Sequence, residues 1–169
     1  MKALVVVDYQ NDHVVGPLGC KYAPMIENNI CKRIEDVLMA RGDLFFVIDY
    51  FEENFMTMVN GKLSHVNYCV RGTKGVELYG RVGDFSSKGY LVRKSSPGSD
   101  ELMRKLARYD DIELCGVETD VDVLANAVVA RAANPSANVI VRQNCVASRN
   151  TDLSEFALDI MNGMGIKVM

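Results

Sequence analysis

A strand, a tight turn and a helix follow one another between residues 112 and 133, and this order restricts the fold more than any other segment. The apolar run 112–115 predicts a buried strand, and the apolar-rich stretch 121–133 predicts a helix that Thr119 would cap. Backbone N–H groups at such a helix start point outward, and the helix dipole favours negative charge there. This arrangement is typical of the places where α/β proteins carry reactive groups.

The same alternation of strand and helix continues along the chain. Further buried strands are expected at 4–7, 44–48, 90–92, 139–141 and 166–168. Helices are expected at 25–38, at 99–108 with Ser99 as cap, and up to residue 161 with Thr151 or Asp152 as cap. Residues 50–87 show no clear period and predict a long irregular excursion. We therefore expect one domain over residues 1–169, with a three-layer, doubly wound, mainly parallel six-stranded sheet and helices on both faces.

Composition excludes several other classes. The net charge of −3 gives no reason to expect nucleic acid as a partner, and no apolar run approaches the roughly 20 residues that span a bilayer. The five cysteines form no CxxC pair, which argues against a disulfide framework or a zinc ribbon. Cys115 and Cys145 end apolar runs and are expected to be buried. A reducing, cytoplasmic setting is the expectation that follows.

Charged residues stand where three of the expected strands end. Asp8 and Asp49 follow the first two strands, Lys94 follows the third, and Asp122 lies in the turn after the fourth. Ligands of open parallel sheets bind beyond the carboxyl ends of the strands, so we expect carboxylates and an ammonium group to converge near a helix start. Each residue also has a plainer interpretation, as a turn residue, a solvated charge or a complement to the helix dipole.

Four blocks resemble the isochorismatase-like cysteine hydrolases, which include the nicotinamidases. They are residues 3–12, 69–78, 91–94 and 116–122, in the family's order. The resemblance implies that Asp8 is the general acid or base and that Lys94 is the active-site lysine. It further implies a cis peptide bond between Val117 and Glu118, with the amides of Glu118 and Asp122 facing a developing oxyanion.

The chain departs from this family's pattern at its reactive positions. Asp122 stands where the nucleophilic cysteine is expected. The divalent ion of the nicotinamidase-type members would have Asp49 as one ligand, but Phe51 and Tyr68 stand at the positions of the histidines. His13 and His65 lie at spacings from Asp49 that are not diagnostic. We expect no cofactor, with a divalent ion on Asp49 as the less favoured alternative.

These residues leave several functions open. The first is cysteine-independent hydrolysis of a small metabolite, with Asp8 as general acid or base, Lys94 as its electrostatic partner and Asp122 activating water. The second is a pseudoenzyme that binds a nicotinamide-like or other aromatic ligand, with Tyr9, Phe51 and Tyr68 as pocket walls.

Two further alternatives concern the origin and role of Asp122. In the third alternative, Asp122 is an engineered replacement in a cysteine hydrolase. In the fourth, Asp122 is itself a nucleophile that forms an acyl anhydride. In every case the expected partner is a small molecule, with no nucleic acid and no membrane. A homo-oligomer is expected by analogy with the family.

Overall fold

The computed structural model describes residues 1–59 and 62–169, with a six-stranded sheet at its centre. The strands of this sheet are Lys2–Val7 (β1), Asp43–Asp49 (β2), Tyr90–Lys94 (β5), Asp111–Val117 (β6), Asn138–Ala147 (β7) and Lys167–Val168 (β8). Their order is β5-β2-β1-β6-β7-β8, and every neighbouring pair is parallel. The expected α/β fold with a parallel six-stranded sheet is therefore confirmed.

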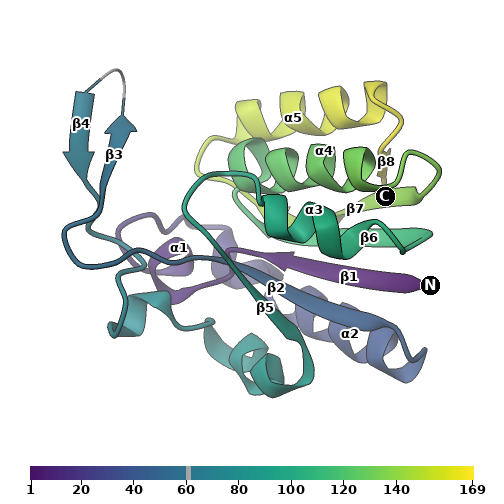
Figure 1. The fold of residues 1–169 in the computed structure, drawn as a ribbon, viewed down its shortest axis with the longest axis horizontal. Helices are drawn as coiled ribbons and strands as arrows, with labels where there is room; N and C mark the ends of the chain where they lie inside the picture. Colours follow the sequence, from purple (N-terminus) through teal and green to yellow (C-terminus); the bar gives the residue numbers. More distant parts are fainter. Residues whose placement is uncertain (60–61) are drawn as a thin grey trace.

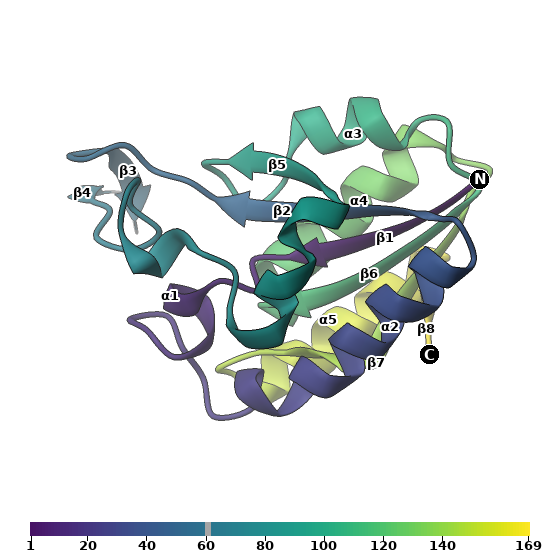
Figure 2. The same ribbon diagram turned by 90° about the horizontal axis from the view of Figure 1, so that it is seen from below.

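Helices cover both faces of the sheet (Figure 1, Figure 2). One face carries Asp100–Leu106 (α3), Leu124–Ala133 (α4) and Thr151–Gly163 (α5), and the other carries Glu27–Met39 (α2) with the 3₁₀ segments Ala23–Ile26 (η1) and Gly80–Lys88 (η3). Val5 and Val7 pack into the apolar cluster of the first face, whereas Leu4 and Val6 pack into that of the second. Among the described residues, no helix has the length and apolar character needed to cross a bilayer.

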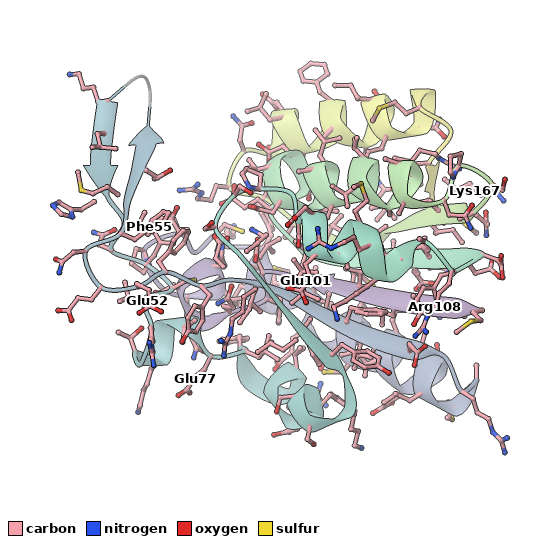
Figure 3. All side chains as sticks on the ribbon, viewed as in Figure 1. Glu52, Phe55, Glu77, Glu101, Arg108 and Lys167 are labelled. Carbon is pink, nitrogen blue, oxygen red and sulfur yellow. The ribbon has the colours of Figure 1, made fainter. Side chains whose placement is uncertain are left out.

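The excursion expected over residues 50–87 contains an antiparallel hairpin that projects from the body of the molecule (Figure 1). Its strands are Met56–Val59 (β3) and Lys62–His65 (β4), and the 3₁₀ segments Lys74–Val76 (η2) and η3 follow. Phe55 lies at the base of the hairpin (Figure 3) and packs against Phe51 with 5.1 Å between ring centroids. The hairpin is thereby joined to the chain that follows β2.

The N-terminal cap of α3 is the residue expected from the sequence, whereas the cap of α5 is a different one. Ser99 caps α3 by accepting a hydrogen bond from a backbone N–H three residues on, as expected. The cap of α5 is Asn150, which makes the same contact. The expectation that Thr151 or Asp152 caps this helix is wrong. Both residues already lie in its first turn, where Asp152 can still complement the helix dipole.

A carboxylate lies buried inside the sheet on the α2 side. Glu113 of β6 is 2% exposed, and Arg33 of α2 donates to both of its carboxylate oxygens, at 2.6 and 2.9 Å. Arg142 of β7 adds a third contact at 3.1 Å. Burial raises the pKa of Glu113, but the hydrogen bonds from Arg33 and Arg142 outweigh burial and hold this pKa below its ordinary value.

Glu113→Gln is expected to lower the free energy of unfolding by about 2–3 kcal/mol at pH 7, because it leaves two guanidinium groups without their carboxylate. Both guanidinium groups keep about a fifth of their side-chain surface exposed, which limits the loss. The lowered folded-state pKa stabilises the protein above the unfolded-state value of roughly 4.3, and this contribution is lost as pH falls through the folded-state pKa. Urea unfolding should therefore show a smaller difference at pH 3.5 than at pH 7. Glu35→Gln, at an exposed position of α2, is the matched control, and equal losses in the two variants would contradict the prediction.

Candidate active site

Four charged residues lie at one edge of the sheet, where parallel strands end together. Asp8 follows β1, Asp49 ends β2 and Lys94 ends β5. Asp122 lies in Thr119–Val123 (η4), a turn of π-helix between β6 and α4. In Figure 2 the arrowheads of β1, β2 and β5 point toward this edge, and Asp49 and Lys94 are directly paired in the sheet.

The ammonium group of Lys94 is the centre of a buried ion-pair network. Its Nζ atom lies 2.6 Å from Asp49 Oδ1, 2.7 Å from Asp8 Oδ2 and 2.9 Å from Asp122 Oδ1. The contacts with Asp49 and Asp122 are hydrogen bonds, whereas the contact with Asp8 is an ion pair without hydrogen-bond geometry. The Lys94 side chain is only 1% exposed, so these three carboxylates take the place of its water shell.

Backbone and side-chain contacts hold the two strand-end carboxylates in place. Asp8 adopts a left-handed conformation with φ of 47°, which turns the chain sharply after β1. The amide of Asp49 donates to Asp8 Oδ1 and to Gln10 Oε1, both at 2.9 Å. His13, in the short helix Asn11–Val14 (α1), places Nε2 3.1 Å from Asp49 Oδ2. Both oxygens of Asp49 therefore have partners inside the protein.

The pKa values of Asp8, Asp49 and Lys94 are shifted in different directions within the network. Burial raises the pKa of Asp8 well above its ordinary value, and Lys94 only partly opposes this. Burial also raises the pKa of Asp49, but contacts with His13 and Lys94 outweigh it and bring the net value below ordinary. For Lys94, burial lowers the pKa, but the three carboxylates raise it by more than burial lowers it. The net pKa is therefore raised, and the ammonium form is retained. Such divergent pKa values in one cluster are typical of functional sites, although structural ion-pair networks produce them as well.

A cavity of about 310 Å³ opens above this network. Its lining is made of residues from several loops and strand ends: His13, Leu18, Asp49, Phe51, Thr57, Tyr68, Ser95, Ser96, Pro97, Glu118, Val121, Asp122 and Arg149. Asp8 and Lys94 do not line the cavity, although Lys94 contacts Asp49 and Asp122, which do. Of the expected pocket walls, Phe51 and Tyr68 both line the cavity and meet edge to face at 5.4 Å.

Tyr9, also expected to line the pocket, does not. It is fully buried in the apolar cluster beneath α2, and its hydroxyl donates to the Ala23 carbonyl oxygen at 2.7 Å. The physical reason is the left-handed turn at Asp8, which directs the next side chain into the core rather than toward the edge of the sheet.

The turn after β6 is held close to the end of β1. The peptide bond between Val117 and Glu118 is cis, and Gly116 has φ of 118°. A Cβ atom at Gly116 would lie 2.0 Å from the Val7 carbonyl oxygen, so only glycine permits this approach. Thr119 is not the expected helix cap: its hydroxyl is buried without a partner among the described residues, because the chain enters η4 from Glu118 instead.

Several lining residues were not among the catalytic and pocket residues expected from the sequence. His13, considered there only as a metal ligand, lies in α1 shortly after the end of β1, and Ser96 and Pro97 follow the end of β5. Arg149 follows the end of β7 and pairs with Glu118 through Nε. All of them lie just beyond strand ends, so a wider use of the strand-end rule would have found them. His65, by contrast, lies in the projecting hairpin and does not line the cavity.

The residues present do not fit the divalent ion that the family resemblance implies. Asp8, His13 and Asp49 place donor atoms within 4.8 Å of one another. However, the ammonium group of Lys94 already contacts Asp8 and Asp49, and a divalent ion on the same oxygens would lie beside this positive charge. The side chains at the two expected histidine positions, Phe51 and Tyr68, supply no imidazole.

Dialysis against a chelator is accordingly expected to leave the melting temperature of the protein unchanged. Added zinc should not raise it, because ion binding would require displacement of Lys94 from Asp49. Differential scanning fluorimetry with and without zinc measures this directly. A rise at low micromolar zinc that a chelator reverses would contradict the assignment.

Comparisons with known proteins agree with the fold and with the family resemblance. A family model described as the isochorismatase domain matches residues 2–169. The pyrazinamidase/nicotinamidase from Streptococcus mutans is 28% identical, with a TM-score of 0.86 and 100% of both chains covered. The nicotinamidase from Staphylococcus aureus is 30% identical, with a TM-score of 0.75 and coverage of 99% of this chain and 97% of that one.

A more distant structure shares the fold alone. The L. infantum protein solved in complex with nicotinate is 19% identical, with a TM-score of 0.81, and the match covers 100% of this chain and 92% of that one. The comparison with curated proteins gives no significant match.

Proposed function

This chain belongs to the isochorismatase domain family, and we propose that it is a small-molecule-binding domain that does not hydrolyse amides. The residue at the position of the family's nucleophilic cysteine is Asp122. Relatives named nicotinamidase and pyrazinamidase suggest a flat ring compound as the ligand. The protein would thus retain the ligand pocket of a hydrolase but not the nucleophile that forms a covalent intermediate.

The observation that carries this proposal is the hydrogen bond of 2.9 Å from Lys94 Nζ to Asp122 Oδ1. It ties the side chain at the nucleophile position into the buried network instead of leaving it free to attack. A carboxylate is also a weaker nucleophile toward amides than a thiolate. Its negative charge would further oppose the oxyanion that amide cleavage must stabilise.

The walls of the cavity support binding of a ring. Phe51 and Tyr68 supply aromatic surface, and Leu18, Pro97 and Val121 add apolar contacts. A volume of about 310 Å³ lies at the lower end of the usual range for small-molecule sites, which suits a single-ring metabolite better than a dinucleotide.

The test measures binding and turnover together. With nicotinamide at millimolar concentration, we expect a rise in melting temperature and no ammonia release above the buffer background. Val121→Trp should abolish the rise by filling the cavity, whereas Val128→Trp should preserve it. The two valines are equally exposed, at 42%, but only Val121 lines the cavity. Ammonia release by the wild-type protein, or equal behaviour of the two variants, would overturn the proposal.

A second candidate function is cysteine-independent hydrolysis, and the raised pKa of Asp8 favours it. A carboxyl group with a raised pKa is better suited to act as general acid than an ordinary one. In cleavage of a vinyl ether, Asp8, which does not line the cavity, would protonate the alkene carbon through an intervening water molecule. Water activated by Asp122 would then add to the resulting oxocarbenium ion, with release of an alcohol and a ketone. Product formation from isochorismate that disappears in Asp8→Asn would support this candidate over the first.

A further inference from the structure

We propose that the cavity selects a flat ring carrying a cationic N–H group, such as an amidinium, a pyridinium or a protonated amine, over neutral amides and carboxylates. This inference rests on the proposed function, because it specifies the ligand of the same cavity. The preference depends on which side chains line the cavity and on the hydrogen bonds that each of them can still form.

Acidic groups line the floor of the cavity. Asp49 and Asp122 face it beside the network, and Glu118 faces it from the turn after β6. Lys94, the lysine that contacts Asp49 and Asp122, does not line the cavity, and its ammonium group is shared among three carboxylates. A carboxylate ligand at the floor would therefore meet negative charge and find no unused ammonium donor.

Asp122 keeps one carboxylate oxygen available to a ligand, and Glu118 Oε2 also receives no hydrogen bond from the described residues. Both oxygens of Asp49 have partners, in Lys94 and His13, and both oxygens of Asp8 lie against protein groups. Asp122 uses Oδ1 for Lys94, while its Oδ2 receives no hydrogen bond from the described residues. Because an ionised carboxylate can only accept, this oxygen requires a ligand that donates, and a charged donor makes the shorter and stronger bond.

The side walls favour the same chemistry. Phe51 and Tyr68 line the cavity on the side of His13, and the faces of aromatic rings attract cations. Arg149, the arginine among the described lining residues, is about half exposed and donates to Glu118. It is thus hydrated and already paired, whereas the floor offers an unused acceptor.

Three ring compounds of nearly equal shape test the inference: benzamidine as the cation, benzamide as the neutral amide and benzoate as the anion. Calorimetry or thermal shift at pH 7.5 and low salt should show benzamidine binding about tenfold or more tightly than benzamide. Benzoate should bind most weakly. Benzamide binding as tightly as benzamidine, or benzoate binding most tightly through Arg149, would overturn the inference while leaving a ring-binding function intact.

A pair of matched variants assigns the preference to its residue. Asp122→Asn keeps the size of the side chain and removes its charge, so benzamidine and benzamide should then bind within about threefold of each other. Asp152→Asn makes the same change at an exposed position of α5, and it should keep the wild-type preference. A cation preference that survives in Asp122→Asn would overturn the assignment. Failure of all three compounds to bind the wild-type protein would reject the proposed function as well.

Discussion

Lys94→Met is expected to lower the free energy of unfolding by about 3–5 kcal/mol, the range typical of a buried charge that loses its partner. Methionine keeps the length of the side chain but removes the ammonium group that lies within 2.9 Å of Asp8, Asp49 and Asp122. Three carboxylates would then face one another at the edge of the sheet, where they have little contact with water. Urea unfolding at pH 7 measures the loss.

The pH dependence of this variant provides an internal check. Without Lys94, burial and repulsion from neighbouring carboxylates raise the folded-state pKa of Asp8 still further above the unfolded-state value of roughly 3.9. Groups with raised folded-state pKa values favour folding at low pH and oppose it as pH rises. The deficit of Lys94→Met should therefore shrink between pH 7 and pH 5. An unchanged deficit would show that lost packing, rather than lost charge, causes the effect.

An exposed lysine serves as the matched control for this substitution. Lys105 of α3 forms an i,i+4 ion pair with Glu101 at 3.4 Å, and both side chains are well exposed. Glu101 is labelled on α3 in Figure 3. Because exposed pairs contribute little, Lys105→Met should cost less than about 1 kcal/mol. A loss as large as that of Lys94→Met would contradict the central role given to the buried network.

The convergence of charged groups at the sheet edge could be predicted because it depends on two simple regularities. Continuous apolar runs identify the buried strands, so the places where they end were evident at Asp8, Asp49 and Lys94. Parallel neighbours then bring those ends to one edge. Neither step requires knowledge of side-chain packing, and both depend on strongly apolar segments whose periodicity is clear.

The details that escaped prediction depend on backbone departures from regular structure. Tyr9 turns into the core because Asp8 adopts a left-handed conformation, which the residue sequence alone does not reveal. Thr119 lost its capping role because a π-helical turn shifts the start of the helix by one residue. The β3–β4 hairpin has strands of only four residues each, too short for a reliable alternation of polar and apolar positions.

A second large effect is expected from Asp122→Cys, which should give the protein an amidase activity, since the proposed function leaves the wild-type chain without one. The new thiol would lie near the ammonium group of Lys94, which favours the thiolate form. Loss of the Asp122 charge also removes one contribution that raises the pKa of Asp8, so a larger fraction of Asp8 is ionised and able to act as general base. In the reaction with nicotinamide, sulfur attacks the carbonyl carbon, ammonia leaves with a proton delivered by Asp8, and water hydrolyses the thioester.

Asp122→Ser is the matched control, because it places a small side chain with a poorer nucleophile at the same position. We expect the cysteine variant to release ammonia from nicotinamide at least about 10²-fold faster than the serine variant. Asp8→Asn in the cysteine background should remove most of this gain, and mass spectrometry should detect the thioester only when Cys is present. Equal rates for cysteine and serine would mean that the cavity lined by Phe51 and Tyr68 does not orient an amide for attack. The proposed lack of amide hydrolysis would then have its cause in the cavity walls as much as in the residue at position 122.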